Sequence, residues 1–407
     1  MAILVQTNTI TFRSFASLVL PFFLFSAIIL QHTAVSRGIS YVVVFLVYSF
    51  SSLLYIHHHG WDIKVNKKHI LLFFLLSDFI LVSTILNLSS GTVVRYVSFL
   101  IFTGTSLFVI PKIIPLQYFL AAASRLSAVI VSIGFLPYFG LRIETAFIDL
   151  SLWSANIYWY PSLKPITSVF VNPNALGFLT LVGSIAALSE LQKDKGRLQI
   201  LFFTINVVGL AFSNYRTGWV AFVVTLSGYV VYRIGGRRLL MTATISGLSL
   251  LSLLLLMIFS VVPGPEALTE ISLNHRRTRW IAGVYALQDK LWWGYGFGNV
   301  VDATQPYTPT ETGNIHNSFI RAFVAFGFGG GFVYLLLYIS TIFDGIRQCD
   351  RYDSIVIPML LLSFLFVQLF NDLTFIGVSL HSATIALSMG YCIDRITEVE
   401  DPEIYST

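Results

Sequence analysis

Three arginines and one histidine in the second half of the chain carry side chains that bind anions and move protons. Arg276, Arg277 and Arg279 form a short cluster, and His316 follows at the end of the same long polar stretch. A guanidinium group stays charged at every relevant pH and matches phosphate oxygens with two parallel hydrogen bonds. An imidazole, with an ordinary pKa of about 6.5, takes a proton from a hydroxyl group at neutral pH. We therefore expect an anion site with His316 as its base, although a lone histidine at such a position is more often structural.

Further polar residues are expected at the same level of the molecule, at the ends of long apolar segments. Arg216 and Arg321 lie at the starts of two such segments, and Asp372 and His381 lie near the ends of two others. A single arginine there is equally well explained as an anchor whose apolar stem lies along lipid while its charge reaches water. Several arginines beside a histidine favour a site that binds an anion.

The composition excludes a soluble globular protein. Of the 407 residues, 56% are apolar and 11% are charged, with a mean hydropathy of +0.77, whereas average proteins carry about 25% charged residues. We predict an all-α, polytopic integral membrane protein with about twelve transmembrane helices. The apolar stretches long enough to cross about 30 Å of hydrocarbon lie near 12–32, 39–56, 69–88, 96–114, 117–138, 166–189, 197–213, 216–234, 239–262, 317–341, 354–373 and 376–394.

The basic residues orient these helices, because cytoplasmic loops are enriched in lysine and arginine. With both termini inside, the cytoplasmic face collects 14 of the 25 basic residues: Arg13, Lys64, Lys67, Lys68, Lys112, Lys193, Lys195, Arg197, Arg233, Arg237, Arg238, Arg347, Arg351 and Arg395. The net charge of +5 therefore mostly reflects topology and gives no case for a nucleic-acid partner.

This topology predicts six consecutive regions and a multi-pass location in the inner membrane. They are N-terminal transmembrane helices at 1–138, an extracytoplasmic loop at 139–165, central transmembrane helices at 166–262, a large extracytoplasmic loop at 263–316, C-terminal transmembrane helices at 317–395 and a cytoplasmic tail at 396–407. The long loop, from about 263 to 315, places the arginine cluster on the extracytoplasmic face.

Residues 274–291 of the long loop predict an amphipathic helix on the membrane surface. Trp280, Val284, Leu287 and Leu291 recur at helical spacing on one stripe. Such a helix would hold Arg276 just above the acyl chains, where the phosphates of a lipid lie. The alternative is a basic helix that is merely attracted to anionic headgroups.

Three glycines follow this predicted helix, in the segment Gly294-Tyr295-Gly296-Phe297-Gly298. The spacing differs from that of a nucleotide-binding loop, and no lysine followed by serine or threonine comes after it. We expect instead a turn in which the backbone comes close to another part of the chain.

No metal or other cofactor is expected. The predicted outer face carries no group of carboxylates with the spacing of a metal site. The two cysteines, Cys349 and Cys392, fall at the predicted inner face, where a reducing compartment keeps them as thiols.

Several short motifs in the second half of the chain resemble those of one family. They are Asn172-Pro173-Asn174, Arg216 with Trp219, Arg276 with Trp280, Gly294-Tyr295-Gly296, and His316-Asn317-Ser318-Phe319-Ile320 followed by Gly327 and Gly330. In this order they resemble the O-antigen ligase and O-antigen polymerase superfamily of bacterial envelope glycosyltransferases. The resemblance covers residues 165–340, and the first half of the chain matches only in hydropathy. Three positions depart from the family pattern, namely Tyr215, Leu291 and Ala325.

The resemblance implies transfer of a glycan from a polyprenyl pyrophosphate to an acceptor hydroxyl at the outer face of the inner membrane, without a metal. The pyrophosphate would be bound by Arg216 and Arg276, and His316 would activate a lipid or glycan acceptor. The arginine cluster adds Arg279 to the pyrophosphate site, and placement by topology adds Arg321. Supporting roles are expected for Asn317, Trp280, Asn172 and Asn174.

Two questions stay open at this point. Polymerisation of repeat units and ligation of a finished chain share these motifs, and we favour polymerisation. A secondary transporter or lipid-linked oligosaccharide flippase is the alternative function, since such proteins also have about twelve spans. Transporters bind their cargo near the bilayer midplane between repeated halves, whereas the polar residues here gather toward one face.

Overall fold

The computed structural model describes residues 12–61, 64–145, 149–265, 276–308, 314–349 and 352–400. The chain forms two compact units, each assembled from two stretches of sequence. Unit 1 comprises Met1–Trp61 and Val109–Phe212, and unit 2 comprises Asp62–Phe108 and Ser213–Thr407. Of the predicted cytoplasmic tail at 396–407, residues up to Glu400 continue helix α16 (Leu380–Glu400), and the rest lies outside the described residues.

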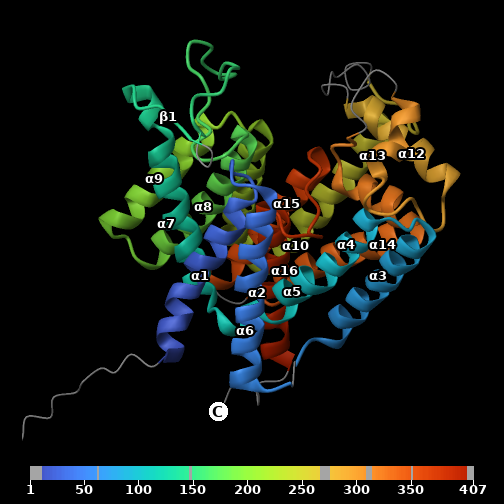
Figure 1. The fold of residues 1–407 in the computed structure, drawn as a ribbon, viewed down its shortest axis with the longest axis horizontal. Coiled ribbons are helices and arrows are strands. Elements are labelled where there is room, and N and C mark those ends of the chain that lie inside the picture. The colour runs from blue at the N-terminus through green and yellow to red at the C-terminus, as the bar shows by residue number, and fades with distance from the viewer. Residues whose placement is uncertain are drawn as a thin grey trace, which may run out of the picture. The chain divides into compact units, whose positions relative to one another are not determined.

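The structure is mostly helical, at 75%, and each of the twelve apolar stretches overlaps with helix over much of its length (Figure 1). Within the described residues, seven helices are long and apolar enough to cross a membrane: Arg37–His59, Lys67–Leu86, Ser90–Ile113, Leu116–Phe139, Pro173–Lys193, Arg216–Ile258 and Ser318–Arg347. Three shorter apolar helices cover Leu18–Leu30, Arg197–Phe212 and Ile355–Phe370. The chain is therefore a multi-pass helical membrane protein, and the total of about twelve spans stays a prediction.

Unit 1 is a bundle in which small residues bring helices close together. Its elements are α1 (Phe12–Leu30), α2 (Arg37–His59), α6 (Ile110–Ile113), α7 (Leu116–Gly134), η2 (Leu136–Phe139), β1 (Ile143–Glu144), β2 (Asp149–Leu150), α8 (Pro173–Lys193) and α9 (Arg197–Phe212). Gly183 of α8 faces Ser127 of α7 so closely that an added Cβ atom would lie 2.7 Å from the serine. Such glycine and serine contacts are typical of helices packed in membranes. The antiparallel pair of β1 and β2 is a small departure from the predicted all-α fold.

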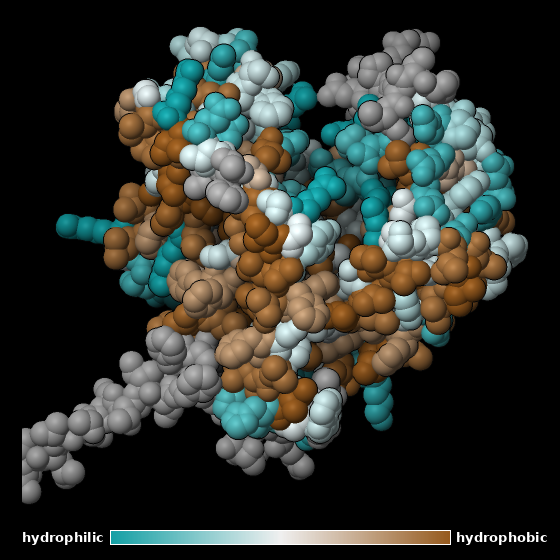
Figure 2. All heavy atoms as spheres, viewed as in Figure 1, coloured by the Kyte–Doolittle hydropathy of each residue, from teal (hydrophilic) through white to brown (hydrophobic). Residues whose placement is uncertain are grey.

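Unit 2 contains the segments that the sequence assigns to the anion site. Its elements are α3 (Lys67–Leu86), α4 (Ser90–Ser98), η1 (Phe99–Thr103), α5 (Gly104–Phe108), α10 (Arg216–Ile258), α12 (Arg276–Asp289), α13 (Val300–Thr304), η3 (Gln305–Tyr307), α14 (Ser318–Arg347), α15 (Tyr352–Phe370) and α16 (Leu380–Glu400). Helix α14 packs on α3, α12, α15 and α16. Hydrophilic residues gather over α12 and α13, and apolar ones over α3 (Figure 2).

Helix α10 consists of two halves joined by a sharp turn, so it matches two predicted spans rather than one. Gly235 and Gly236 leave helical geometry, and Gly236 has a φ of 63°, which only glycine adopts at little cost. The side chain of Leu240 then returns beside Gly228. The two halves therefore run as a helical hairpin.

The predicted glycine turn is confirmed, and its partner is a kink in α14. Gly327 has a φ of 74°, and the peptide of Trp292 occupies the space that a Cβ atom of Gly327 would need. The backbone amides of Tyr295, Gly296 and Phe328 donate to the carbonyls of Val324, Ala325 and Leu291 at 3.0, 2.9 and 2.7 Å. The loop after α12 thus pairs with the opened backbone of α14, which satisfies groups that a kink leaves unpaired.

Candidate functional site

Helix α12 confirms the predicted loop helix, but it packs on the protein differently from the predicted stripe. Its buried residues are Trp280, Ala282, Gly283 and Ala286. Gly283 lies against α14, where an added Cβ atom would be 2.7 Å from Cγ2 of Ile320. Val284 and Leu291 keep 37% and 40% exposure, whereas Trp280 has none. The stripe was wrong for Trp280, because this large side chain is buried beside the rings of Phe259 and Phe370, which helical periodicity does not reveal.

Trp280 belongs to a group of rings that supports Arg276. Its ring centroid lies 6.1 Å from that of Phe259 and 6.0 Å from that of Phe370. The guanidinium carbon of Arg276 lies 5.8 Å from the centroid of Phe370. A cation over an aromatic face is attracted by the negative face of the ring, so the first residue of α12 is held at the end of α15.

His316 lies immediately before α14 in an unusual backbone conformation. Its φ is 52°, a left-handed geometry that costs a residue other than glycine about 1–2 kcal/mol. Asn317, 3% exposed, stabilises the following turn: its Oδ1 accepts from the amides of Phe319 and Ile320 at 3.0 Å each. Asparagine at this position is a strong helix cap. The predicted supporting role of Asn317 is therefore to begin the helix that fixes His316.

Ser318 and Arg321, near the start of α14, bind the segment that follows α15. The hydroxyl of Ser318 donates to the carbonyl of Asn371 at 2.9 Å and accepts from the amide of Leu373 at 2.7 Å. One turn later Arg321 forms an ion pair with Asp372. The Arg321 guanidinium carbon also lies 4.9 Å from the centroid of Phe297. Arg321 was predicted to bind pyrophosphate, yet the carboxylate of Asp372 neutralises much of its charge.

The start of α10 is tied to the same segment. The side-chain amide of Asn371 donates to the hydroxyl of Tyr215 at 3.4 Å, and Asn214 before it has a φ of 55°. Tyr215 is buried, which raises the pKa of its hydroxyl, while the charge of Arg276 acts to lower it. Arg216, the first residue of α10, is thus placed near the first residue of α12.

Positive charge dominates the electrostatics of this site. Burial lowers the pKa of Arg276, and the nearby charges of Arg216 and Arg279 lower it further. Each arginine thus raises the free energy of the other's charged form. Arg216 also begins its helix, where the helix dipole adds positive potential. An incoming anion would relieve this repulsion.

His316 lies within the same field. Burial is the largest cause that lowers its pKa, the charges of Arg279 and Arg276 act in the same direction, and the carboxylate of Asp372 opposes them. The imidazole is therefore neutral at pH 7 and able to accept a proton. Oδ1 of Asp372 is buried and has no hydrogen-bond partner among the described residues.

The structure brings together most of the predicted site residues. Arg216, Arg276, Arg279, Arg321 and His316 all belong to one cluster in unit 2. The motif Asn172-Pro173-Asn174 lies in unit 1. There Asn172 caps α8 by accepting from the amide of Asn174 at 2.8 Å, and a part for this motif in the site stays a prediction.

Sequence reasoning did not identify two aromatic residues that shape the site. Phe370 supports Arg276, and Tyr215 lies beside it. Asp372 was expected at this level of the molecule, because a carboxylate at the end of an apolar helix needs a partner, but its pairing with Arg321 was not predicted. No feature of the sequence distinguished Phe370 and Tyr215, because aromatic residues are common at the ends of membrane helices.

Within the described residues no group of three or more histidine, cysteine, aspartate or glutamate side chains has the arrangement of a metal site. Cys349 and Cys392 are both buried thiols and form no disulfide with each other.

Fold and site together define a multi-pass helical membrane protein with a cluster of arginines and a neutral histidine at the ends of its helices. Residues 201–335 match the family model described as O-Antigen ligase. This confirms the resemblance to the O-antigen ligase and polymerase superfamily, and the matched range contains Arg216, Arg276 and His316. No curated protein matches the chain in sequence.

Proposed function

We propose that the protein is a membrane glycosyltransferase that transfers a glycan from a polyprenyl pyrophosphate to an acceptor hydroxyl in envelope polysaccharide biosynthesis. The observation that carries the proposal is that Arg276 lies over the ring of Phe370 while Ser318, two positions after His316, donates a hydrogen bond to the carbonyl of Asn371, the residue that follows Phe370. A site for an anionic leaving group and a base for an alcohol are therefore adjacent.

The pyrophosphate is bound by Arg216, Arg276 and Arg279. Charge develops on the leaving pyrophosphate as the glycosidic bond breaks, and positive groups already in place stabilise that charge without reorganising. Mutual repulsion of Arg216 and Arg276 makes such an anion a favourable partner. Each charge-assisted hydrogen bond contributes on the order of 1.5–3 kcal/mol.

His316 activates the acceptor. Its imidazole takes the proton of the hydroxyl while the oxygen forms a bond to the anomeric carbon of the donor glycan. The bond from that carbon to the pyrophosphate oxygen breaks, and the electron pair leaves with the lipid pyrophosphate. The carboxylate of Asp372, which acts on His316, stabilises the imidazolium. Arg321 holds this carboxylate in place rather than binding the donor itself.

The reaction takes place on the extracytoplasmic face of the inner membrane and needs no metal or cofactor. The acceptor is a glycan or a lipid, and polymerisation of lipid-linked repeat units is favoured over ligation to a lipid core. The side of the membrane follows from the distribution of basic residues in the loops.

The test is a transfer assay in proteoliposomes with a polyprenyl-pyrophosphate glycan and candidate acceptors. His316→Ala is expected to lower kcat by about 10²–10⁴-fold, and the matched control His57→Ala, at the exposed end of α2, is expected to act as wild type. Wild-type turnover by His316→Ala would refute the base. Loss of wild-type activity in a chelator, restored by a divalent metal, would refute metal-independent transfer.

A further inference from the structure

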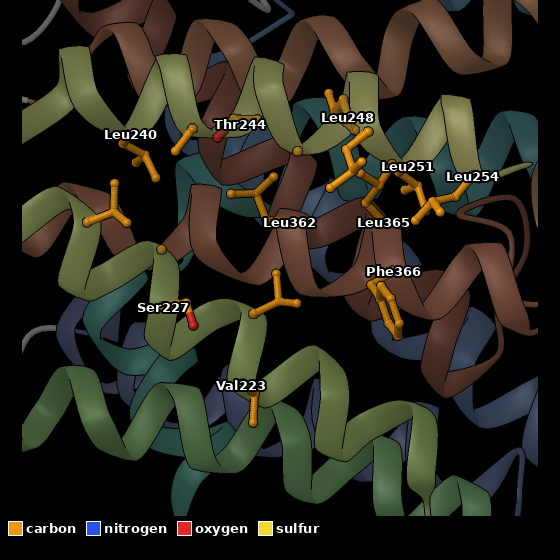
Figure 3. Close-up of a pocket in the computed structure, with 16 residues that line it drawn as sticks. Val223, Ser227, Leu240, Thr244, Leu248, Leu251, Leu254, Leu362, Leu365 and Phe366 are labelled. Atoms are coloured by element: carbon orange, nitrogen blue, oxygen red, sulfur yellow. The ribbon is translucent and has the colours of Figure 1, made fainter. Parts of the chain in front are cut away.

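An apolar groove lies in unit 2 between the two halves of α10 and helix α15. It encloses about 400 Å³. In Figure 3, Val223 and Ser227 line it from the first half of α10, Thr244 and Leu251 from the second half, and Phe366 from α15. Its lining is almost wholly hydrocarbon, so it suits an apolar occupant and excludes a glycan.

One end of the groove is closed by the turn of α10. The halves meet where Leu240 lies beside Gly228. Below this contact the hydroxyl of Tyr232 donates to the carbonyl of Cys349 at 3.2 Å, and Arg237 donates to the carbonyl of Arg347 at 3.0 Å. An occupant therefore cannot continue past the turn.

The other end leads to the arginines. Val223 is seven positions after Arg216, about 10 Å along a helix. On α15 the ring of Phe366 lies 5.0 Å from that of Phe370, and Arg276 lies over Phe370 at 5.8 Å. The first half of α10 and helix α15, which form two walls of the groove, thus both lead to Arg216 and Arg276.

We infer that this groove binds the hydrocarbon tail of the donor, a polyprenyl chain whose pyrophosphate lies at Arg216 and Arg276. The inference rests on the proposed function. A hydrocarbon chain directly joined to an anion fits a dry groove that ends at guanidinium groups. The donor is chosen over a lipid-linked acceptor because the donor's own pyrophosphate is the leaving group held at the arginines, whereas the lipid of the acceptor is separated from the reacting hydroxyl by sugars.

Gly247 provides a test that leaves the fold intact. It lines the groove, and a Cβ atom added there would meet no atom within 4 Å. Gly247→Leu therefore adds apolar bulk inside the groove from a position with open space for its Cβ atom, and leucine favours helix more than glycine does. The matched control is Gly38→Leu on α2, where an added Cβ atom also meets nothing.

The measurement is KM for two donors that carry the same glycan, one on a long polyprenyl chain and one on a single dimethylallyl unit. Gly247→Leu is expected to raise KM for the long donor about tenfold, the effect of losing the burial of about two methylene groups. KM for the dimethylallyl donor should stay within twofold of the wild-type value, because a single isoprene unit bound at the arginines does not reach Gly247. Gly38→Leu should leave both values unchanged.

Three results would overturn the inference. They are an unchanged KM for the long donor in Gly247→Leu, an equal rise for both donors, and a rise confined to the acceptor. Failure of the proposed function is distinguishable, because wild-type protein would then transfer glycan from neither donor. The second measurement is photocrosslinking of wild-type protein by a polyprenyl pyrophosphate with a diazirine in its tail. Peptides with Leu251 or Phe366 should be labelled, and labelling confined to other helices would overturn the inference.

Discussion

The guanidinium group of Arg321 pairs with the carboxylate of Asp372, one helical turn after the cap that follows His316. The pair brings negative charge into a site where the arginines otherwise prevail. It also joins the start of α14 to the segment after α15. The side chains are 14% and 10% exposed, so the pair is largely shielded from water.

Removing one partner of this pair should destabilise the protein. Arg321→Met leaves the carboxylate of Asp372 without its partner, and we expect a loss of about 2–3 kcal/mol, less than for a fully buried pair. Thermal unfolding in detergent measures this loss. The double variant Arg321→Met/Asp372→Leu should regain most of the stability, because no isolated charge remains. A double variant as unstable as the sum of both single variants would contradict this reading.

The pH dependence of transfer should follow the charges around His316. The base works when neutral, and burial with Arg279 and Arg276 holds the pKa of His316 below its usual value. Activity should therefore persist below pH of about 6.5 and fall only as the pH drops through the lowered pKa. Arg279→Gln removes a charge that lowers this pKa, so the acidic limb of kcat/KM should move to higher pH. Asp372→Asn removes a charge that raises it, so the limb should move to lower pH.

Shifts in the opposite directions, or an acidic limb that is the same in both variants, would show that another group controls the profile. The profile of Arg277→Gln serves as the control. The guanidinium group of Arg277 donates to the hydroxyl of Ser260 at 3.0 Å. The charges that shift the pKa of His316 are those of Arg279, Asp372 and Arg276, and not that of Arg277.

The kink of α14 should tolerate only glycine. Gly327→Ala places a methyl group against the peptide of Trp292 and forces alanine into a positive φ, so we expect a loss of at least about 2 kcal/mol. Gly38→Ala should be neutral or stabilising by up to about 1 kcal/mol, because its space is open. Thermal unfolding of both variants in detergent measures these changes. Equal stabilities of Gly327→Ala and Gly38→Ala would contradict the requirement for glycine at position 327.

Local sequence features predicted most of the helices and the main polar residues of the site. The arginines at the starts of α10 and α12, and His316 before α14, were recognisable because charges in an apolar chain must lie at helix ends or have partners. The glycine turn was predicted from Gly294 and Gly296, although its partner Gly327 was not. That pairing joins backbone groups far apart in the sequence, which no local pattern records.

The orientation of α12 shows the same limit. Periodicity assigned Trp280, Val284 and Leu291 to one membrane-facing stripe, yet Trp280 is buried against Phe259 and Phe370. Small residues such as Gly283 form the packed face instead. Hydrophobicity alone does not distinguish a contact with lipid from a contact with another helix, because both are apolar.

The central claim is that arginines bind the donor while His316 performs proton transfer. It is tested most directly by measuring equilibrium binding of polyprenyl pyrophosphate and single-turnover transfer in Arg276→Ala and His316→Ala, with Arg277→Ala as control. Arg276→Ala should weaken binding by about 10–100-fold. His316→Ala should bind within about twofold of wild type and lose transfer. Unchanged binding by Arg276→Ala together with normal transfer by His316→Ala would contradict the account.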